Sequence, residues 1–335
     1  MKEGLLTAMK IVIPDDYQDM VDQLECFSLI RHHEVTRYRV PARDLDELAE
    51  RLHDADVVVS IRERVEFSRA LLERLPRLKL IALVGRNSQA IDFAACTAVG
   101  VPVAAGKSNS PVAPAELTLA LIVASRRNVA REAERMKRGE WPCTLSHRLR
   151  GSTLGIYGLG AIGELVAAGG RGLGMDVLVW GQENSLAKAA ASGYAAASSK
   201  RELFERADVL SLHVRLTRET RGIIGPEDLD RMKPTALIVN TARAEIIAPG
   251  ALLAALRQGR PGYAAVDVYE QEPIVDGDHP LLSMPNVLCT PHLGWAEWDN
   301  FELYFREAFE QIVAYERGLP LRLRNPEVRM RSGSA

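Results

Sequence analysis

The sequence predicts an α/β protein made of two doubly wound, parallel-sheet domains with a cleft between them. Short apolar runs alternate with helix-like segments along most of the chain, an order that is typical of parallel sheets. A stretch at 106–114 that is rich in glycine, serine and proline interrupts this alternation. The length of 335 residues also favours about two domains.

The first third of the chain indicates a flavodoxin-like sheet. Helix-like segments at 44–53 and 69–75 alternate with apolar runs. A long apolar helix is expected beyond the small-residue stretch, over 115–138. The apolar runs predict strands at 10–13, 35–38, 57–59, 80–83 and 101–103.

A glycine-rich turn in the second domain predicts a Rossmann-type dinucleotide site. Gly158 allows a tight turn, Gly160 lets backbone N–H groups approach a pyrophosphate, and Gly163 lets helix and strand pack closely. A strand–helix–strand unit surrounds the turn, with elements expected at 153–157, 164–173 and 177–180. The residues of the turn predicted to bind the cofactor are Gly158, Gly160, Ala161, Ile162 and Gly163.

Three polar residues far apart in the chain each follow a strand-like run. They are Arg243, Glu272 and His292, after runs at 236–239, 263–266 and 287–289. Ligands bind at the carboxyl ends of the strands in an open α/β sheet, so we expect the three side chains to meet at one crevice. An imidazole held by a carboxylate beside a guanidinium can protonate and anchor an α-keto acid, provided that a hydride source lies nearby.

Each of the three side chains would have its own part in reducing a keto acid. Protonated His292 would give its proton to the developing alkoxide while a nicotinamide delivers hydride. Glu272 would fix the ring and favour its charged form. Arg243 would grip the substrate carboxylate in a fork geometry that a lysine does not reproduce.

These ordered motifs resemble those of the D-isomer-specific 2-hydroxyacid dehydrogenases, a family that includes phosphoglycerate dehydrogenase and glyoxylate/hydroxypyruvate reductase. The resemblance runs from about residue 56 to residue 292. By this resemblance, Arg243, Glu272 and His292 fall on the family's catalytic arginine, glutamate and histidine. The implied activity is that of an NAD(P)-dependent oxidoreductase acting on the CH–OH group of 2-hydroxy acids.

The resemblance also implies a division of the chain. A flavodoxin-like, substrate-binding (catalytic) domain would comprise 1–106 and 296–335, and an NAD(P)-binding Rossmann domain would comprise 107–295. A helix over 295–315 would pack back on the first domain. A homodimer is expected, formed through the long helix that begins near residue 115.

Substrate-binding residues are also implied by the resemblance. Backbone N–H groups of Gly85, Arg86 and Asn87 would complete the site for the substrate carboxylate, and Arg64, or Arg62, would reach in from the end of a strand. The bulky side chains of this loop would lie near the substrate and affect which small 2-keto acid or 2-hydroxy acid binds. Phosphoglycerate, glyoxylate and hydroxypyruvate remain candidates.

The cofactor is predicted to be NAD, with NADP left open. The acid that usually grips the adenosine ribose of NAD is absent after the second strand, where Trp180 is followed by Gly181, Gln182 and Glu183. No arginine follows at once to bind a 2′-phosphate. Further residues expected on the cofactor side are Gln182, His213, Thr241, Asp267 and Gly294.

Composition argues against several other classes of protein. A formal net charge of −2 disfavours a nucleic-acid partner, and the longest apolar runs are shorter than the roughly 20 residues of a membrane span. Four scattered cysteines form no metal-like cluster, so we expect reduced thiols and no metal site. The first residues lack the basic and apolar pattern of a secretory signal, so a cytoplasmic location is expected. A dinucleotide-sensing binding protein, similar to a corepressor and with little turnover, remains the alternative to an enzyme.

Overall fold

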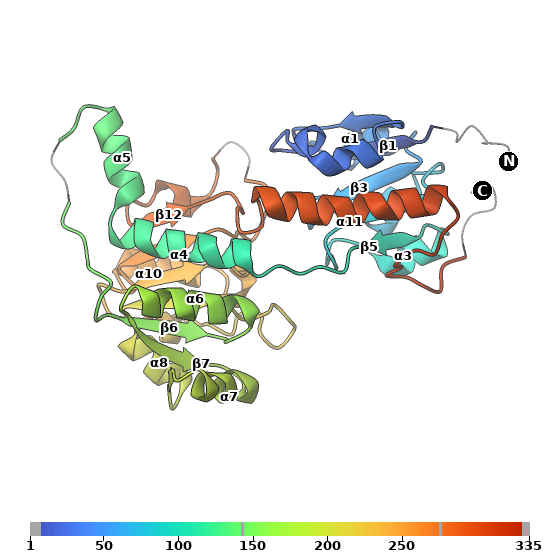
Figure 1. The fold of residues 1–335 in the computed structure, drawn as a ribbon. Coiled ribbons are helices and arrows are strands. Elements are labelled where there is room, and N and C mark those ends of the chain that lie inside the picture. Colours follow the sequence, from blue (N-terminus) through green and yellow to red (C-terminus); the bar gives the residue numbers. More distant parts are fainter. Residues whose placement is uncertain (1–7, 142–143, 275–276, 330–335) are drawn as a thin grey trace. The chain divides into compact units, whose positions relative to one another are not determined.

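The chain divides into two compact units. Unit 1 comprises Met1–Ser110 and Trp298–Ala335, and unit 2 comprises Pro111–Glu297. The structure, a computed structural model, describes residues 8–141, 144–274 and 277–329 (Figure 1). Each unit is an α/β body around its own parallel sheet, so the predicted fold class of two doubly wound domains is confirmed.

Unit 1 contains a five-stranded sheet in the order β2-β1-β3-β4-β5. All neighbouring strands run parallel, and the order is that of flavodoxin-like folds. β3 and β4 are buried along their whole length, as expected for central strands covered on both faces. The strands are β1 Lys10–Ile13, β2 Glu34–Arg37, β3 Val57–Ile61, β4 Leu80–Val84 and β5 Val103–Ala105.

Helices cover both faces of this sheet. α11 Trp298–Glu316 packs on β4 and β5, and its buried residues Phe305, Phe309 and Ile312 recur at helical spacing, which gives the helix one apolar face. α1 begins where the side chain of Asp44 accepts a hydrogen bond from the backbone N–H of Glu47. The other helices are η1 Val21–Gln23, η2 Glu25–Leu29, α1 Leu45–Leu52, α2 Arg69–Leu72 and α3 Phe93–Ala98.

The segment after α11 covers the edge of β5. Backbone hydrogen bonds join Ala105 to Arg322 and Arg324 to Val103, at 3.0 and 2.8 Å. The side chain of buried Asn325 accepts a further bond from the N–H of Val103 at 2.9 Å. An edge strand that would otherwise expose unpaired backbone groups is thereby satisfied.

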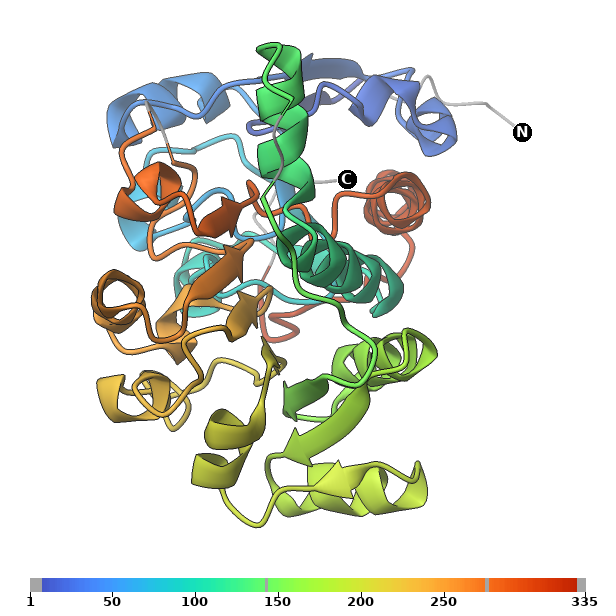
Figure 2. The same cartoon turned by 90° about the vertical axis from the view of Figure 1, so that its left-hand side faces the viewer.

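Unit 2 contains a seven-stranded parallel sheet in the order β12-β11-β10-β9-β6-β7-β8 (Figure 2). The chain starts in the middle at β6, builds outward to β8, and then crosses over to β9. This crossover makes the boundary between β6 and β9 a topological switch point, where such sheets bind ligands. The strands are β6 Thr153–Tyr157, β7 Asp176–Trp180, β8 Ala195–Ala196, β9 Val209–Leu212, β10 Leu237–Asn240, β11 Tyr263–Val266 and β12 Val287–Cys289.

The two faces of this sheet form separate cores because side chains alternate along each strand. On β7, Val177 and Val179 belong to one core, and Leu178 belongs to the other. The first core includes residues of α4 and α6, and the second includes residues of α8 and α10. The helices are α4 Val112–Arg126, α5 Val129–Lys137, α6 Ala161–Gly172, α7 Glu183–Ala191, α8 Lys200–Arg206, α9 Pro226–Leu229, α10 Ala251–Gln258, η3 Ala244–Ile246 and η4 Pro280–Ser283.

The prediction of one long helix over 115–138 is wrong. The chain breaks at Asn128, whose backbone adopts the left-handed conformation that asparagine tolerates better than most residues. The Asn128 side chain donates hydrogen bonds to Thr144 Oγ1 and to the Leu145 carbonyl oxygen. α5 therefore turns away from α4 (Figures 1 and 2), and none of its residues is buried.

Smaller differences concern short elements. The strand expected at 101–103 lies at Val103–Ala105, and the two-residue edge strand β8 was not predicted. The helix expected from residue 164 begins at Ala161, and the helix expected from residue 295 begins at Trp298. Among the described residues, no helix is both long and apolar enough to cross a membrane.

Candidate active site

The glycine turn between β6 and α6 is forced by close packing. Gly158 has a φ of +94°, and a Cβ there would lie 3.0 Å from the carbonyl oxygen of His213. A Cβ on Gly163 would lie 2.4 Å from the carbonyl oxygen of Gly158. Neither position can hold a side chain without moving the backbone, so the first turn of α6 is held directly against the end of β6.

Gly160 differs from the other two glycines. It is exposed, a Cβ there would meet no atom within 4 Å, and it directly precedes Ala161, the first residue of α6. The free backbone N–H groups at this helix end therefore lie beside open space. This is the arrangement that accepts a phosphate group.

His213 lies beneath the glycine turn, at the end of β9. Its Nε2 is 2.9 Å from Ser211 Oγ, and burial lowers its pKa to about 4, so the ring is neutral in the physiological range. Gln182 stands as the N-cap of α7 after β7, and Gln182 and Glu183 are both exposed. The predicted cofactor residues of this part of the chain thus lie at the carboxyl ends of β6, β7 and β9.

A buried asparagine fixes the loop that carries Arg243. At the end of β10, Asn240 Oδ1 accepts a hydrogen bond from the N–H of Ala242 at 3.0 Å, and Asn240 Nδ2 donates to the Arg243 carbonyl oxygen at 2.9 Å. Thr241 Oγ1 lies 2.7 Å from Thr118 Oγ1, which ties the loop to α4. Arg243 therefore follows β10 on a backbone with little freedom.

Glu272 and His292 form a close pair. His292 Nδ1 lies 2.5 Å from Glu272 Oε2, and the second oxygen, Oε1, accepts a hydrogen bond from the N–H of Tyr269 at 2.9 Å. Burial alone would raise the pKa of Glu272, but the bond to His292 and the charges of His292 and Arg243 hold that pKa below its ordinary value. Arg243, Glu272 and His292 follow the adjacent strands β10, β11 and β12, and the charge of Arg243 acts on the Glu272 carboxylate.

The turn that carries His292 is bound by Asp267, a buried residue that follows β11. Asp267 Oδ1 accepts hydrogen bonds from the N–H of Leu293 at 2.7 Å and from Thr290 Oγ1 at 2.6 Å, and Oδ2 accepts from the N–H of Gly294 at 2.8 Å. Burial is the main cause that raises the pKa of Asp267, and these donors and His292 counteract it. The positioning of this turn by Asp267 could be inferred only partly from the sequence, where an acid at the end of a buried strand indicated bonds to local backbone.

His292 itself has a left-handed backbone, with a φ of +50°. A non-glycine residue in this region costs on the order of 1–3 kcal/mol and persists where the surroundings enforce it. The bonds from the neighbouring residues 293 and 294 to Asp267 supply that enforcement. In this conformation the imidazole contacts Glu272 through Nδ1.

The predicted substrate residues lie in unit 1, at the carboxyl ends of β3 and β4. Gly85 has a φ of +118°, and Arg86 and Asn87 are exposed. The guanidinium of Arg62, rather than that of Arg64, lies against Gly85, with its Nη1 at 3.2 Å from the Cβ position.

Arg64 instead binds residues that follow β1. Its guanidinium donates to the Asp15 carbonyl oxygen at 2.6 Å and to Gln18 Oε1 at 2.9 Å, and it stacks 4.7 Å from the ring centre of Tyr17. The structure thus brings Arg243, Glu272 and His292 together in unit 2, and in unit 1 it holds Arg64 against the segment that follows β1.

The arrangement in unit 2 defines a class of protein. A doubly wound sheet with a glycine turn at a helix N-terminus, and a histidine–carboxylate pair beside an arginine on adjacent strand ends, is typical of a dinucleotide-dependent oxidoreductase. Residues 119–294 match the family model described as D-isomer specific 2-hydroxyacid dehydrogenase, NAD binding domain. The chain belongs to this family.

Similar proteins of known name agree with this assignment. The chain is 39% identical over 275 residues to a D-3-phosphoglycerate dehydrogenase of Methanocaldococcus jannaschii, covering 82% of this chain and 52% of that protein. It is 34% identical to a glyoxylate reductase of Aeropyrum pernix, covering 84% and 87%. A crystal structure of a putative D-3-phosphoglycerate dehydrogenase oxidoreductase from Ralstonia solanacearum has 48% identity and a TM-score of 0.92, covering 96% and 98%.

These similarities decide several of the predictions made from sequence. The predicted family, the class of NAD-dependent oxidoreductase and NAD as cofactor are confirmed, and nothing in the comparisons supports the corepressor-like alternative. The chain spans about half the length of the M. jannaschii relative. Of the cysteines predicted to be reduced, Cys26, Cys96 and Cys289 are free thiols, and Cys143 lies outside the described residues.

Proposed function

We propose that this protein is an NAD-dependent D-2-hydroxyacid dehydrogenase that interconverts a small 2-keto acid and the corresponding 2-hydroxy acid. The observation that carries the proposal is the contact of His292 with Glu272, beside Arg243, at the ends of three adjacent strands. This set can bind a carboxylate and transfer a proton at the neighbouring carbon.

The residues present fit a dinucleotide. Side chains are excluded at Gly158 and Gly163, and open space lies beside Gly160 at the start of α6. When bound there, NAD supplies the group that accepts or donates hydride. The backbone from Gly158 to Gly163, including Ala161 and Ile162, would hold the pyrophosphate. Other residues of the cofactor site would be Gln182, His213, Thr241, Asp267 and Gly294.

His292 acts as the acid in reduction and as the base in oxidation. Because its Nδ1 faces Glu272, its Nε2 is the nitrogen available to the substrate oxygen. The ring gives up the Nε2 proton and keeps the Nδ1 proton, which continues to bind Glu272. A positioned acid of this kind contributes about 10²–10⁴ in rate.

Arg243 binds the substrate carboxylate. A guanidinium presents paired donors that match the two carboxylate oxygens, and its fixed charge also polarises the neighbouring carbonyl group. Backbone N–H groups of Gly85, Arg86 and Asn87, with Arg64, would complete substrate binding from residues 1–106. In this proposal unit 1 is the substrate-binding domain and unit 2 the NAD-binding domain.

The test is a panel of 2-keto acids assayed with NADH and with NADPH. The panel contains hydroxypyruvate, 3-phosphohydroxypyruvate and glyoxylate, because the named relatives act as phosphoglycerate dehydrogenase and glyoxylate reductase. We expect NADH-dependent reduction of at least one of them and a higher kcat/KM with NADH than with NADPH. A tenfold advantage for NADPH would refute the NAD preference.

A variant links the activity to the proposed site. His292→Ala should lower turnover by about 10²–10⁴ while NADH binding, followed by fluorescence, is largely kept. Turnover equal to that of the parent enzyme would remove the assignment of His292. Negligible turnover of the parent enzyme on every keto acid, together with dinucleotide-dependent capture of a protein partner, would favour the corepressor-like function.

We further propose a homodimer in the cytoplasm. Apolar side chains of α5 and of the residues after it are exposed, among them Val129, Met136, Trp141 and Leu145, at 52–96%. A group of this kind on a monomer marks an interaction surface, and a second copy of the chain is the proposed partner. Trp141→Glu should convert a dimer to a monomer in size-exclusion chromatography with light scattering, and fractionation of cells tests the location.

A further inference from the structure

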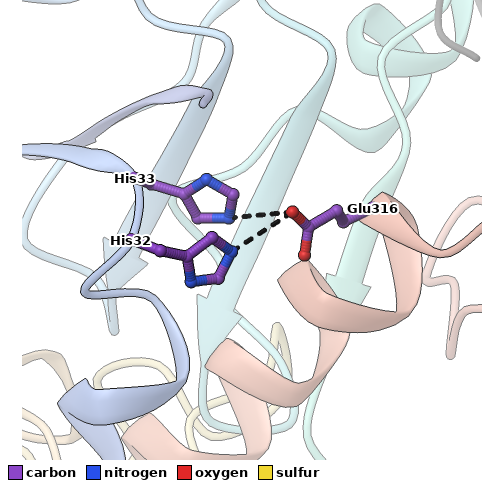
Figure 3. A group of neighbouring side chains, drawn as sticks. All are labelled: His32, His33 and Glu316. Atoms are coloured by element: carbon purple, nitrogen blue, oxygen red, sulfur yellow. Dashed lines mark hydrogen bonds and ion pairs between the residues drawn. The ribbon is translucent and has the colours of Figure 1, made fainter. Parts of the chain in front are cut away.

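Two histidines and a glutamate meet in unit 1, apart from the residues assigned to catalysis. His32 and His33 lie between η2 and β2, and Glu316 is the last residue of α11. Figure 3 shows both imidazole rings directed at the same carboxylate oxygen. The distances from Glu316 Oε1 are 3.2 Å to His32 Nε2 and 3.8 Å to His33 Nε2.

The buried ring nitrogen of His33 is the unusual feature of this cluster. The His33 side chain is fully buried, and its Nε2 has no hydrogen-bond partner among the residues that the structure describes. Buried polar atoms nearly always have a hydrogen-bond partner, so a buried nitrogen that lacks one and points at a carboxylate needs an explanation. The 3.8 Å separation from Glu316 is too long for a hydrogen bond.

A simple ion pair accounts for only part of the arrangement. His32, half exposed, can form an ordinary hydrogen bond to Glu316. That pair leaves His33 Nε2 without a hydrogen bond to a described residue. The centres of the two imidazole rings are only 3.9 Å apart. Two imidazolium groups at this distance would repel each other, and burial with the neighbouring His32 lowers the pKa of His33, so the neutral ring is favoured.

The spacing of the three atoms fits a metal ion. All three potential ligand atoms lie within 4.8 Å of one another. Ligands about 2.0–2.2 Å from a tetrahedral Zn²⁺ are separated by about 3.4 Å, close to the two distances from Glu316. Two neutral imidazoles and a carboxylate are also the donors that Zn²⁺ and similar borderline ions prefer.

We propose that His32 Nε2, His33 Nε2 and Glu316 Oε1 bind one divalent transition-metal ion of the Zn²⁺ type. The exposed side of His32 leaves a fourth position for water. The ion would fasten the end of α11 to the segment before β2 and so hold together two parts of unit 1 that are separated by 284 positions in the sequence. The sequence predicted no metal site, since the adjacent histidines give no sign of a carboxylate so far away.

Metal binding has a consequence for the hydrogen bond at Met9. The Met9 N–H now donates to His33 Nδ1 over 3.3 Å, which places the ring proton on Nε2. A metal ion on Nε2 requires the ring proton to be on Nδ1. The Nδ1–H group would then face the N–H of Met9, and two donors cannot form a hydrogen bond. The proton moves within the ring, none is released by His33, and the bond to Met9 opens.

The experiment is a titration of tag-free, chelator-treated full-length protein with ZnCl₂ by calorimetry. The His292→Ala background removes the catalytic histidine–glutamate pair as a competing site. We expect one Zn²⁺ per chain, a rise in Tm, and binding weaker by about tenfold or more in both His32→Ala and Glu316→Gln. Titration with Co²⁺ should give the visible absorption of a four-coordinate ion.

His53→Ala provides the matched control. His53 and Asp54 also form an exposed histidine–carboxylate pair in unit 1, at 3.1 Å, and no third metal ligand completes it in the part of the chain that the structure describes. This variant should bind Zn²⁺ as the background protein does. The proposal is overturned if the background protein takes up no stoichiometric Zn²⁺, or if His32→Ala and Glu316→Gln bind it as tightly as His53→Ala. A circular dichroism spectrum verifies that both variants are folded, which matters most for Glu316→Gln because the Glu316 side chain is largely buried.

Discussion

Polar side chains at the carboxyl ends of the strands differ in their hydrogen bonding between the two units. In unit 2, polar side chains at or just after the ends of β10 and β11 bind the neighbouring backbone, as Asn240, Asp267 and Glu272 do. In unit 1, Asp15 follows β1 and is buried, yet neither of its carboxylate oxygens accepts a hydrogen bond from a described residue. In both units the carboxyl ends of the strands are where a doubly wound sheet binds ligands. The neighbouring Asp16 accepts hydrogen bonds from Met20, Val21 and Arg37, so the contrast with unit 2 rests on the carboxylate of Asp15.

The two units also differ in the direction in which the pKa of such a carboxyl group is shifted. In unit 2, hydrogen bonds and charges hold the pKa of Glu272 below its ordinary value, so that the carboxylate is ionised and available to His292. In unit 1, burial raises the pKa of Asp15 to about 8, although Arg64 counteracts it. Organised carboxylates in unit 2 suit proton transfer, whereas the Asp15 carboxyl destabilises the folded state when it is charged.

The largest expected effect comes from disrupting the organised pair. Glu272→Gln removes the charge that favours imidazolium, and we expect kcat for keto-acid reduction to fall by about 10²–10⁴. Because Glu272 acts through His292, the pH profile of reduction should also move to lower pH. Steady-state assays over a range of pH values measure both changes.

Glu270→Gln is the control for this variant. Glu270 lies two positions before Glu272 and is exposed, 3.4 Å from His279. Its pH profile should match that of the parent enzyme. A profile for Glu272→Gln that keeps the parent shape, with only a lower maximum, would contradict an electrostatic role for Glu272.

The next effect concerns the turn that carries His292. Asp267→Asn leaves one of the N–H groups of Leu293 and Gly294 opposite an amide NH₂ group instead of an oxygen. The strained backbone of His292 should then relax, and a displacement on the order of 1 Å lowers turnover by about 10–10². Turnover and NADH affinity measured together check this expectation.

Thr290→Val gives a graded comparison for Asp267. It removes only the side-chain donor to Asp267 Oδ1 and leaves both backbone bonds in place. Its loss of turnover should be smaller than that of Asp267→Asn. Equal losses would show that the turn is not held by the backbone bonds.

Much of the architecture could be predicted because local patterns determine it. The strands at Lys10–Ile13, Thr153–Tyr157 and Tyr263–Val266 coincide with the predicted ranges, since each is an apolar run bounded by polar or turn-forming residues. The glycine turn could be predicted for a similar reason. Its residues occur in one short segment, and their steric requirements are local.

Features that depend on distant partners could not be predicted. The break at Asn128 is stabilised by Thr144, and nothing in the apolar pattern before it signals that bond. The position of Arg64 depends on Asp15 and Gln18, which lie more than 40 positions earlier. Sequence reasoning assigned Arg64 to the strand end correctly but had no means to choose its partners.

The smallest expected effect is on stability and comes from the buried carboxyl group of Asp15 in unit 1. The pKa of Asp15 is about 8 in the folded protein and 3.8 as the ordinary value, so the folded state binds a proton more tightly than the unfolded chain. The stability that this group contributes is therefore fully present below about pH 4 and is lost as the pH rises through about 8. Asp15→Asn removes the charge and should cancel this loss.

Thermal melting at several pH values tests the effect of Asp15. We expect Asp15→Asn to melt roughly 3 °C above the parent protein at pH 9 and to lose that advantage toward pH 5. Asp54→Asn, at an exposed position of the same unit, should show no such gain at high pH, since the pKa of Asp54 is lowered by its bond to His53. A gain in Tm for Asp15→Asn that is equal at pH 5 and pH 9 would mean that packing around residue 15, and not the buried charge, limits the stability of the protein.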